Sequence, residues 1–195
     1  ASRPWQGRVI GINLHLTTVT GLLIRELVLG GATCIVSAAN MATTDAGTVE
    51  SMRNRGVEVY TGGDMRDRHM QVLSHNPEVL IDVGFDLIGT LLEKRPDLAK
   101  NLAGAVEITR SGVTRLRDRV DSLPFPVINI NDGRLKDAVE NKNGVGAAIW
   151  PAVTALTGMH LSGRRLAVVG YGPVGRGLSS HAKATGMNVE VVEQD

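Results

Sequence analysis

The chain has 195 residues, of which 43% are apolar and 21% are charged, a composition typical of a globular protein rather than a disordered one. Its 21 Lys and Arg residues nearly balance 20 Asp and Glu residues, for a formal net charge of +1. This balance argues against nucleic acid as the main partner, because phosphate binding needs an excess of basic residues. No apolar run approaches the ~20 residues that cross a bilayer, and the first residues lack the apolar core of a signal peptide. We therefore expect a cytoplasmic protein that does not bind membranes.

Short apolar runs alternate with helical patterns along the first two thirds of the chain. Six runs rich in β-branched residues predict strands, at residues 8–13, 33–37, 57–60, 79–82, 103–107 and 127–130. Apolar residues at helical spacing predict helices between them, at residues 17–29, 48–55, 64–75 (with Asp64 as N-cap), 87–94 and 113–120. The alternation predicts an α/β fold, a Rossmann-like parallel sheet with helices on its faces. Ligands of such sheets bind beyond the carboxyl ends of the strands.

A glycine-rich motif marks the last part of the chain. An apolar helix at 147–156, expected to bend or begin late at Pro151, is followed by a strand near 166–169, a helix at 174–184 and a strand at 189–192. The sequence G-Y-G-P-V-G-R-G at 170–177 joins the first of these strands to its helix. This placement is the fingerprint of a dinucleotide site, whereas a glycine-rich turn without a ligand is the alternative.

Each position of this motif has a physical role in holding a dinucleotide. Gly170 permits a tight turn, Gly172 lets the backbone approach the pyrophosphate, and Gly175 lets helix and strand pack closely. The helix N-terminus attracts the diphosphate, and an acidic residue at the end of the second strand accepts hydrogen bonds from ribose, which favours NAD over NADP. The expected NAD contacts are therefore Gly170, Gly172, Pro173, Val174, Gly175 and Glu193.

These patterns predict two domains and a connection. Residues 1–143 are expected to form a substrate-binding α/β domain, 144–160 a connecting helix, and 161–195 the beginning of a Rossmann NAD-binding domain. A complete domain of that kind needs further strands, so either the sequence is a piece of a longer chain or a partner chain completes the sheet.

Polar residues follow several of the predicted strands. Lys136 and Glu140 are four residues apart, on one face of a short helix, and could form either a solvent-exposed ion pair or a group that binds ribose and transfers protons. His15, at the end of the first strand, is either an acid–base group or a structural residue. No His or Cys spacing indicates a metal site.

Six segments, in order along nearly the whole chain, resemble motifs of one family. They are residues 14–17 (L-H-x-T), 37–44 (S-x-x-N-x-x-[ST]-T), 81–86 (D-D-G-G-D), 107–112 (E-E-T-T-T-G), 129–141 (N-x-N-D-S-x-T-K-x-x-x-D-N) and 170–177 (G-Y-G-x-V-G-K-G). On these motifs the chain resembles the adenosylhomocysteinase (S-adenosylhomocysteine hydrolase) family.

The resemblance implies an NAD-dependent reaction and, from the family, a homo-oligomer. In it, NAD oxidises the ribose 3′-hydroxyl of an adenine nucleoside, the 5′ substituent is eliminated, water adds, and the ketone is reduced again. By position, His15, Lys136 and Glu140 would be catalytic. Thr17, Asp82 and Glu107 would bind the nucleoside, and Thr109 and Asn141 would contact NAD.

Several positions depart from the family's motifs. Val83 and Ile108 stand where the family has a second aspartate and a second glutamate, and losing one catalytic acid–base group costs on the order of 10²–10⁴-fold in rate. The resemblance therefore favours an adenosylhomocysteinase-like enzyme acting on a variant nucleoside. A non-catalytic nucleotide-binding relative that modulates a true hydrolase, and S-adenosylhomocysteine hydrolysis in a rearranged pocket, are the alternatives.

Overall fold

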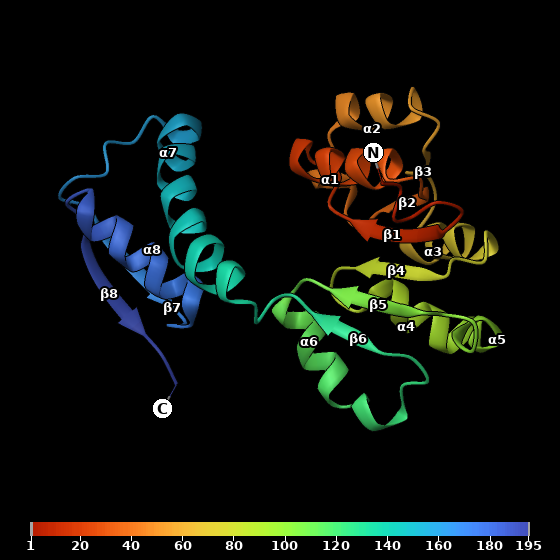
Figure 1. The fold of residues 1–195 in the computed structure, drawn as a ribbon. Helices are drawn as coiled ribbons and strands as arrows, with labels where there is room; N and C mark the ends of the chain where they lie inside the picture. The colour runs from red at the N-terminus through yellow and green to blue at the C-terminus, as the bar shows by residue number, and fades with distance from the viewer. Residues whose placement is uncertain (1, 195) are drawn as a thin grey trace. The chain divides into compact units, whose positions relative to one another are not determined.

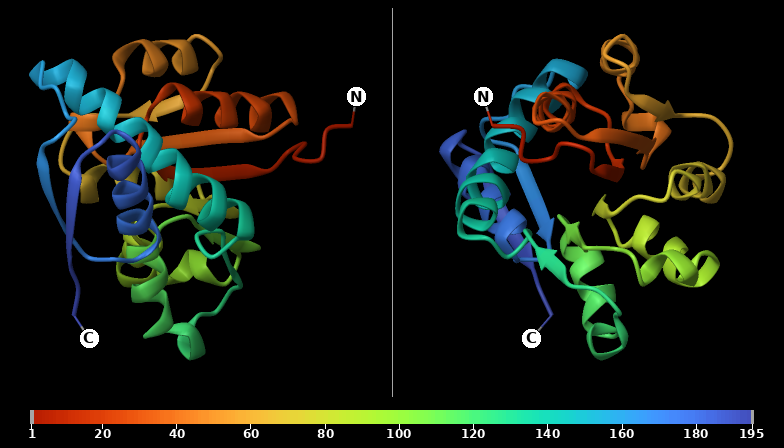
Figure 2. Two further views of the ribbon diagram at one scale, coloured as in Figure 1. Left: turned by 90° about the vertical axis from the view of Figure 1, so that its left-hand side faces the viewer. Right: turned by 45° about the vertical axis from the view of Figure 1, so that its right-hand side comes forward.

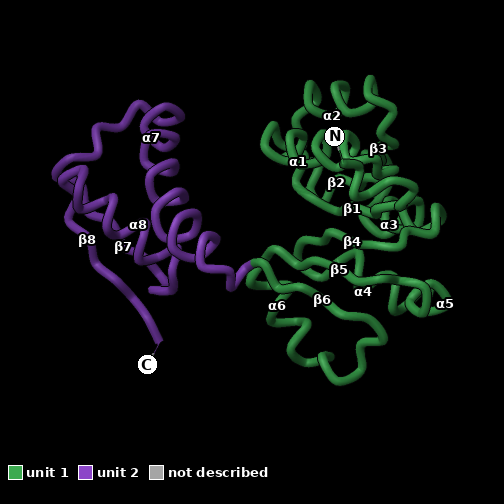
Figure 3. The backbone as a smooth tube through the Cα atoms, viewed as in Figure 1, with its two compact units in different colours: residues 1–130 green, residues 131–195 purple. Residues whose placement is uncertain are grey.

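A computed structural model describes residues 2–194 and divides the chain into two compact units, residues 1–130 and 131–195 (Figure 3). The second unit takes in both the segment after the sixth strand and the glycine-rich motif. A boundary at residue 143 between separately folding domains stays a prediction. Each unit is described by itself.

The first unit is built on a parallel sheet of six strands (Figure 1). The strands are β1 (Val9–Leu14), β2 (Thr33–Ala38), β3 (Glu58–Tyr60), β4 (Val79–Asp82), β5 (Gly104–Glu107) and β6 (Val127–Asn129). Their order is β3-β2-β1-β4-β5-β6, and every neighbouring pair is parallel. The chain thus builds outward from β1 in one direction and then from β4 in the other. This arrangement confirms the predicted α/β fold and places a topological switch point between β1 and β4.

Helices connect the strands and cover both faces of the sheet (Figure 2). They are α1 (Thr18–Leu29), α2 (Ala46–Arg53), α3 (Met65–Ser74), α4 (Asp86–Lys94), α5 (Pro96–Ala99) and α6 (Arg110–Arg117), with short 3₁₀ turns η1 (Met41–Thr43) and η2 (Val120–Ser122). The predicted N-cap is confirmed, because the Asp64 side chain accepts a hydrogen bond from the Asp67 backbone N–H at 2.8 Å.

Two apolar clusters form the core of this unit. One gathers Ile10, Ile12 and Leu14 of β1 with side chains of α1 and α2. The other gathers side chains of α3, α4 and α5, among them Leu73 and Leu91, which are fully buried. Because helices cover both faces of the sheet, its central strands β1, β2 and β4 are mostly apolar and buried, as the sequence pattern predicts.

The second unit contains η3 (Lys136–Gly144), α7 (Val145–Thr157), β7 (Arg165–Val169), α8 (Pro173–Ala184) and β8 (Asn188–Val192). Strands β7 and β8 are parallel and are joined through α8. Trp150 of α7, Ala182 of α8 and Met187 form its small core. Helix α7 begins before residue 147 and runs through Pro151, which removes only one backbone N–H from its hydrogen-bond ladder. The expected late start at the proline is therefore wrong.

Segment η3 is a π-helix of nine residues, where the sequence predicted a short ordinary helix. Its last bond runs from the Val145 N–H to the Glu140 carbonyl, five residues back. Such segments are rare and are frequent at functional sites.

Candidate functional site

The loop that follows β1 carries His15 and Thr17 at the switch point, and both residues are exposed. The His15 Nδ1 atom lies 2.7 Å from the Thr43 hydroxyl. That hydroxyl also lies 3.1 Å from the Asn40 carbonyl; when it donates there, it accepts from Nδ1–H, and the Nε2 atom of the neutral ring is left as an acceptor. On its other side, the His15 carbonyl accepts from the Thr20 hydroxyl at 2.6 Å. The imidazole is thus held in one orientation on an exposed loop.

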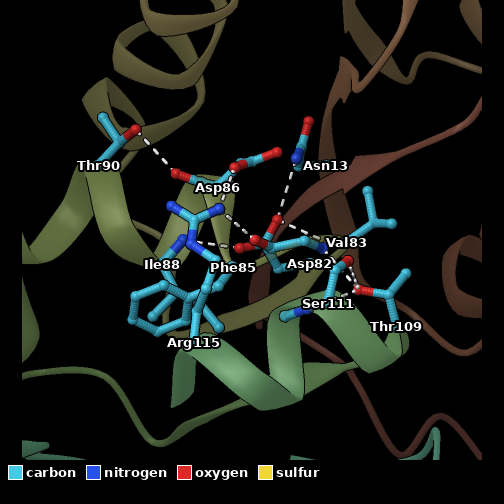
Figure 4. A network of polar contacts seen from close by, with 12 residues as sticks. Asn13, Asp82, Val83, Phe85, Asp86, Ile88, Thr90, Thr109, Ser111 and Arg115 are labelled. Carbon is cyan, nitrogen blue, oxygen red and sulfur yellow. Dashed lines mark hydrogen bonds and ion pairs between the residues drawn. The ribbon is translucent and has the colours of Figure 1, made fainter. Parts of the chain in front are cut away.

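The Asp82 carboxylate, at the end of β4, is completely buried. Its Oδ1 atom accepts from Asn13 Nδ2 at 3.0 Å and from the Val83 N–H at 2.8 Å, and its Oδ2 atom accepts from the Ile88 N–H at 2.8 Å (Figure 4). Burial raises the pKa of Asp82 to about 7, against the hydrogen bonds from Ile88 and Asn13, which lower it. The side chain therefore holds the loop between β4 and α4 in place.

Glu107, at the end of β5, is also completely buried. Its Oε1 atom accepts from the Gly84 N–H at 3.1 Å and from the Thr109 N–H and hydroxyl at 2.8 and 2.6 Å. Its Oε2 atom accepts from the Phe85 N–H at 2.8 Å. Four protein donors thus converge on one carboxylate, which ties the loop after β4 to the start of α6.

Thr109 completes this polar network (Figure 4). Its hydroxyl accepts from the Gly84 N–H at 2.9 Å and from the Gly112 N–H at 3.1 Å, where it caps α6. The network requires unusual backbone, since Gly84 and Phe85 both have positive φ, +78° and +63°. For a phenylalanine that conformation is strained. Asp82, Glu107 and Thr109, predicted to contact substrate or NAD, are therefore engaged with the protein itself, and their ligand contacts stay predictions.

Apolar side chains lie next to these buried carboxylates. Val83 is buried in the same apolar cluster as Leu14 and Leu16 of the first strand and its loop, and Ile108 packs against that cluster. The ends of β4 and β5 thus carry hydrocarbon side chains at the two positions where the motifs of the resembling family have acids.

Sequence reasoning missed three contributors to this network. Asn13 and Ser37 are buried, and the Ser37 hydroxyl donates to Asn13 Oδ1 at 3.1 Å, which extends the network across β2, β1 and β4. Arg115 of α6 donates to the Gly84 carbonyl and pairs with Asp86 at 2.7 Å. The signal for Asn13 and Ser37 was available, as polar residues within apolar strands, but nothing local pointed to Arg115.

In the second unit, Lys136, Glu140 and Asn141 all belong to the π-helix. The Lys136 ammonium forms an ion pair with the Glu140 carboxylate. Since a π-helix bonds residue i to residue i+5, residues four and five apart lie on the same side. The structure therefore brings these three predicted site residues together on one face of one segment.

The glycine-rich loop has the shape expected of a dinucleotide site. Gly170 has a φ of +93°, and a Cβ atom at Gly175 would lie 2.1 Å from the Gly170 carbonyl oxygen. A Cβ atom at Gly172 would meet nothing within 4 Å, so there is open space over the backbone where α8 begins at Pro173. The Glu193 carboxylate accepts from the Tyr171 N–H, which lowers the pKa of that carboxyl. Glycine positions, helix terminus and acid thus fit a nucleotide diphosphate and its ribose.

Residues 2–194 contain neither a cluster of metal-ligating side chains nor a helix that could span a membrane. Within this range, no group of three or more His, Cys, Asp or Glu side chains lies close enough together to hold a metal ion. None of the helices in this part of the chain is long and apolar enough to cross a bilayer.

The strand order and the glycine-rich loop define an α/β protein of the Rossmann type. No family model matches the chain. It is 36% identical to the S-inosyl-L-homocysteine hydrolase of Methanopyrus kandleri, 34% identical to the adenosylhomocysteinase of Thermococcus kodakarensis and 32% identical to that of Thermotoga maritima. Each of these matches covers 99% of this chain, but only 47%, 48% and 50% of the respective relatives. The chain is a sequence relative of the adenosylhomocysteinase family and spans about half the length of these relatives. Among solved structures, the chain is similar to the quinone oxidoreductase of Coxiella burnetii, at a TM-score of 0.47 and 12% identity. The match covers 100% of this chain and 55% of that one.

Proposed function

We propose that the chain carries nucleoside-binding and NAD-binding parts of an adenosylhomocysteinase-like enzyme that acts on a variant substrate. The enzyme would oxidise a ribose hydroxyl of an adenine nucleoside and so permit elimination and addition at the 5′ side. Identity of 32–36% to named hydrolases along nearly the whole chain supports the class of enzyme.

The cofactor proposed is NAD, which when bound would accept hydride from the ribose and return it at the end of each cycle. The backbone N–H groups that open α8 and the open space over Gly172 would take the diphosphate, and Glu193 would accept hydrogen bonds from the adenosine ribose. The fit of these residues, and not their motif alone, supports the choice.

The chain's own polar groups would bind the nucleoside and transfer protons. Lys136, oriented by its ion pair with Glu140, would hold the reacting sugar hydroxyls, and Asn141 would lie next to the nicotinamide. His15 is proposed to act near the 5′ leaving group, because its exposed imidazole is held through Nδ1 by the Thr43 hydroxyl and so presents Nε2 outward. Thr17, exposed on the same loop, would contact the nucleoside.

One observation carries the proposal of a variant substrate. At the ends of β4 and β5, Asp82 and Glu107 are buried and saturated with protein donors, while Val83 and Ile108 are apolar. The two carboxylates are thus occupied by protein donors, and the two apolar side chains offer a ligand no hydrogen bond. The relatives' names already differ in the base of the nucleoside, adenine in some and hypoxanthine in others, which supports testing altered nucleosides.

The test uses the full-length protein that contains this sequence. It would be mixed with S-adenosylhomocysteine, S-inosylhomocysteine and a panel of adenosine derivatives altered at the 5′ position, and reduced nicotinamide would be followed by absorbance and product by mass spectrometry. We expect turnover of at least one altered nucleoside at a higher kcat/KM than of S-adenosylhomocysteine. Lys136→Ala should lower that rate by at least 100-fold, whereas Lys142→Ala, an exposed lysine on the same π-helix, is the matched control.

The other outcomes decide between the alternatives. Preferential turnover of S-adenosylhomocysteine would favour a rearranged pocket over a variant substrate. No reduced nicotinamide with any nucleoside, together with an unchanged partner-modulating activity in Lys136→Ala, would favour a non-catalytic relative.

A further inference from the structure

The last glycine of the glycine-rich motif, Gly177, is not among the expected dinucleotide contacts, and it is buried. It lies in α8, beyond the loop that would contact the diphosphate. A Cβ atom there would lie 2.2 Å from the Lys142 carbonyl oxygen and 3.2 Å from the Asn141 carbonyl oxygen. Real Cβ atoms essentially never lie as close as 2.2 Å to another atom, so the backbone of α8 touches the π-helix only because residue 177 has no side chain.

A second glycine faces the first across the same contact. A Cβ atom at Gly146, in the first turn of α7, would lie 2.6 Å from the Gly177 carbonyl oxygen and 2.7 Å from the His181 ring. One turn further along α7, the Trp150 indole N–H donates to the Leu178 carbonyl at 3.1 Å. Two glycines and one hydrogen bond thus form a tight joint between α8 and the segment that runs from the π-helix into α7.

This joint connects two groups of predicted site residues. On one side, α8 begins at the glycine-rich loop. On the other, the carbonyls that meet Gly177 belong to Asn141 and Lys142, one and two residues after Glu140. Because the π-helix places Lys136 and Asn141 on one face, its position along α8 sets where both side chains lie relative to the loop.

We propose that Gly177 is a positioning residue, which by its lack of a side chain fixes the π-helix, and with it Lys136 and Asn141, against the helix that begins at the cofactor loop. The proposal rests on the proposed function, since it concerns the placement of the lysine relative to bound NAD. It explains a π-helix at this place, because the wider turn brings the carbonyls of Asn141 and Lys142 to α8.

The test compares two glycine-to-alanine variants of the full-length protein. Gly177→Ala adds a methyl group at the joint, whereas Gly144→Ala adds the same group to the same π-helix in ordinary contact, 3.5 Å from the Val139 carbonyl oxygen. Bound NAD, kcat and KM, and hydrogen exchange of the amides of residues 136–146 would be measured for both, with unfolding followed by circular dichroism.

We expect Gly177→Ala to keep its fold and its NAD, to lower kcat at least tenfold with KM changed less than threefold, and to exchange the amides of residues 136–146 at least tenfold faster. Gly144→Ala should stay within twofold of the wild type in each. A kcat and an exchange rate of Gly177→Ala within twofold of the wild type would overturn the proposal. So would equal losses in both variants.

If Gly177→Ala does not fold, Trp150→Phe decides, since it removes the indole donor to the Leu178 carbonyl and keeps an aromatic ring in the core. Faster exchange at residues 136–146 with a lower kcat and retained NAD supports the proposal, and an unchanged kcat and exchange rate refute it. A wild-type protein that never forms reduced nicotinamide would overturn the proposed function by itself, while the exchange measurement would still report on the joint.

Discussion

Replacing Glu107 with glutamine tests whether this buried carboxylate is part of the scaffold or a substrate contact. The Gln oxygen can take the place of Oε1, which accepts from Gly84 and Thr109. The amide NH₂ then faces the Phe85 N–H, which in the wild type donates a hydrogen bond to Glu107 Oε2 at 2.8 Å. One charge-assisted bond is lost, and two buried donors, the Phe85 N–H and the new amide NH₂, face each other without an acceptor, for a cost of about 2–4 kcal/mol. Urea unfolding of the chain, followed by circular dichroism, measures this difference.

The control is Glu93→Gln, which removes an exposed carboxylate paired with Arg66 and Lys94 on the surface of α4. Such pairs contribute little, so its free energy of unfolding should stay close to that of the wild type. A Glu107→Gln protein as stable as the control, but with a raised KM in the full-length enzyme, would refute our reasoning and assign Glu107 to the substrate.

Three further predictions follow from the same contacts. Burial raises the pKa of Asp82 to about 7 from an ordinary 3.8, so folding disfavours its ionised form. The free energy of unfolding should therefore fall as the pH rises from 3.8 to about 7, by up to about 4 kcal/mol. In urea unfolding, Asp82→Asn should flatten that decline, and an unchanged slope would contradict this. Gly112→Ala would place a Cβ atom 2.1 Å from the Glu107 carboxyl carbon, so it should destabilise the chain by about 1–3 kcal/mol in thermal unfolding. The control Gly47→Ala, whose Cβ atom would meet nothing closer than 3.5 Å, should not destabilise it. Gly175→Ala should weaken NAD binding at least tenfold by calorimetry, because its methyl group would push against the Gly170 carbonyl of the loop; affinity equal to that of the wild type would show that the loop does not hold the cofactor.

Much of the fold was predictable from local patterns. The strand predicted at residues 79–82 coincides with β4, and most other strands and helices differ from their predictions by one to three residues at the ends. This succeeds because buried parallel strands and the helices between them have different apolar periods, which are visible in any short window. The glycine-rich loop was equally local, since a strand, a turn and a helix N-terminus are contiguous in the chain.

The orientation of the strand-end carboxylates was decided by the tertiary structure. Side chains alternate along a strand, but both faces of this sheet are buried, so the pattern does not say whether Asp82 points into the protein or toward a ligand. Asp82 is oriented by the backbone N–H of Ile88 and by Asn13 from another strand, and Glu107 is oriented in the same way by the backbone N–H of Phe85. Those donors are brought together only when β1, β4 and β5 pair.

The π-helix likewise combines a feature that the local sequence determined with one that depends on tertiary structure. The sequence by itself determined that Lys136 and Glu140 would share a face, because residues four apart are neighbours in either kind of helix. Only the tertiary structure decided that the segment would add a residue to its turn, since the carbonyls of Asn141 and Lys142 meet α8 at Gly177. The physical reason is that local residue preferences act within a few positions, whereas close contact between two backbones depends on a glycine that lies far along the chain.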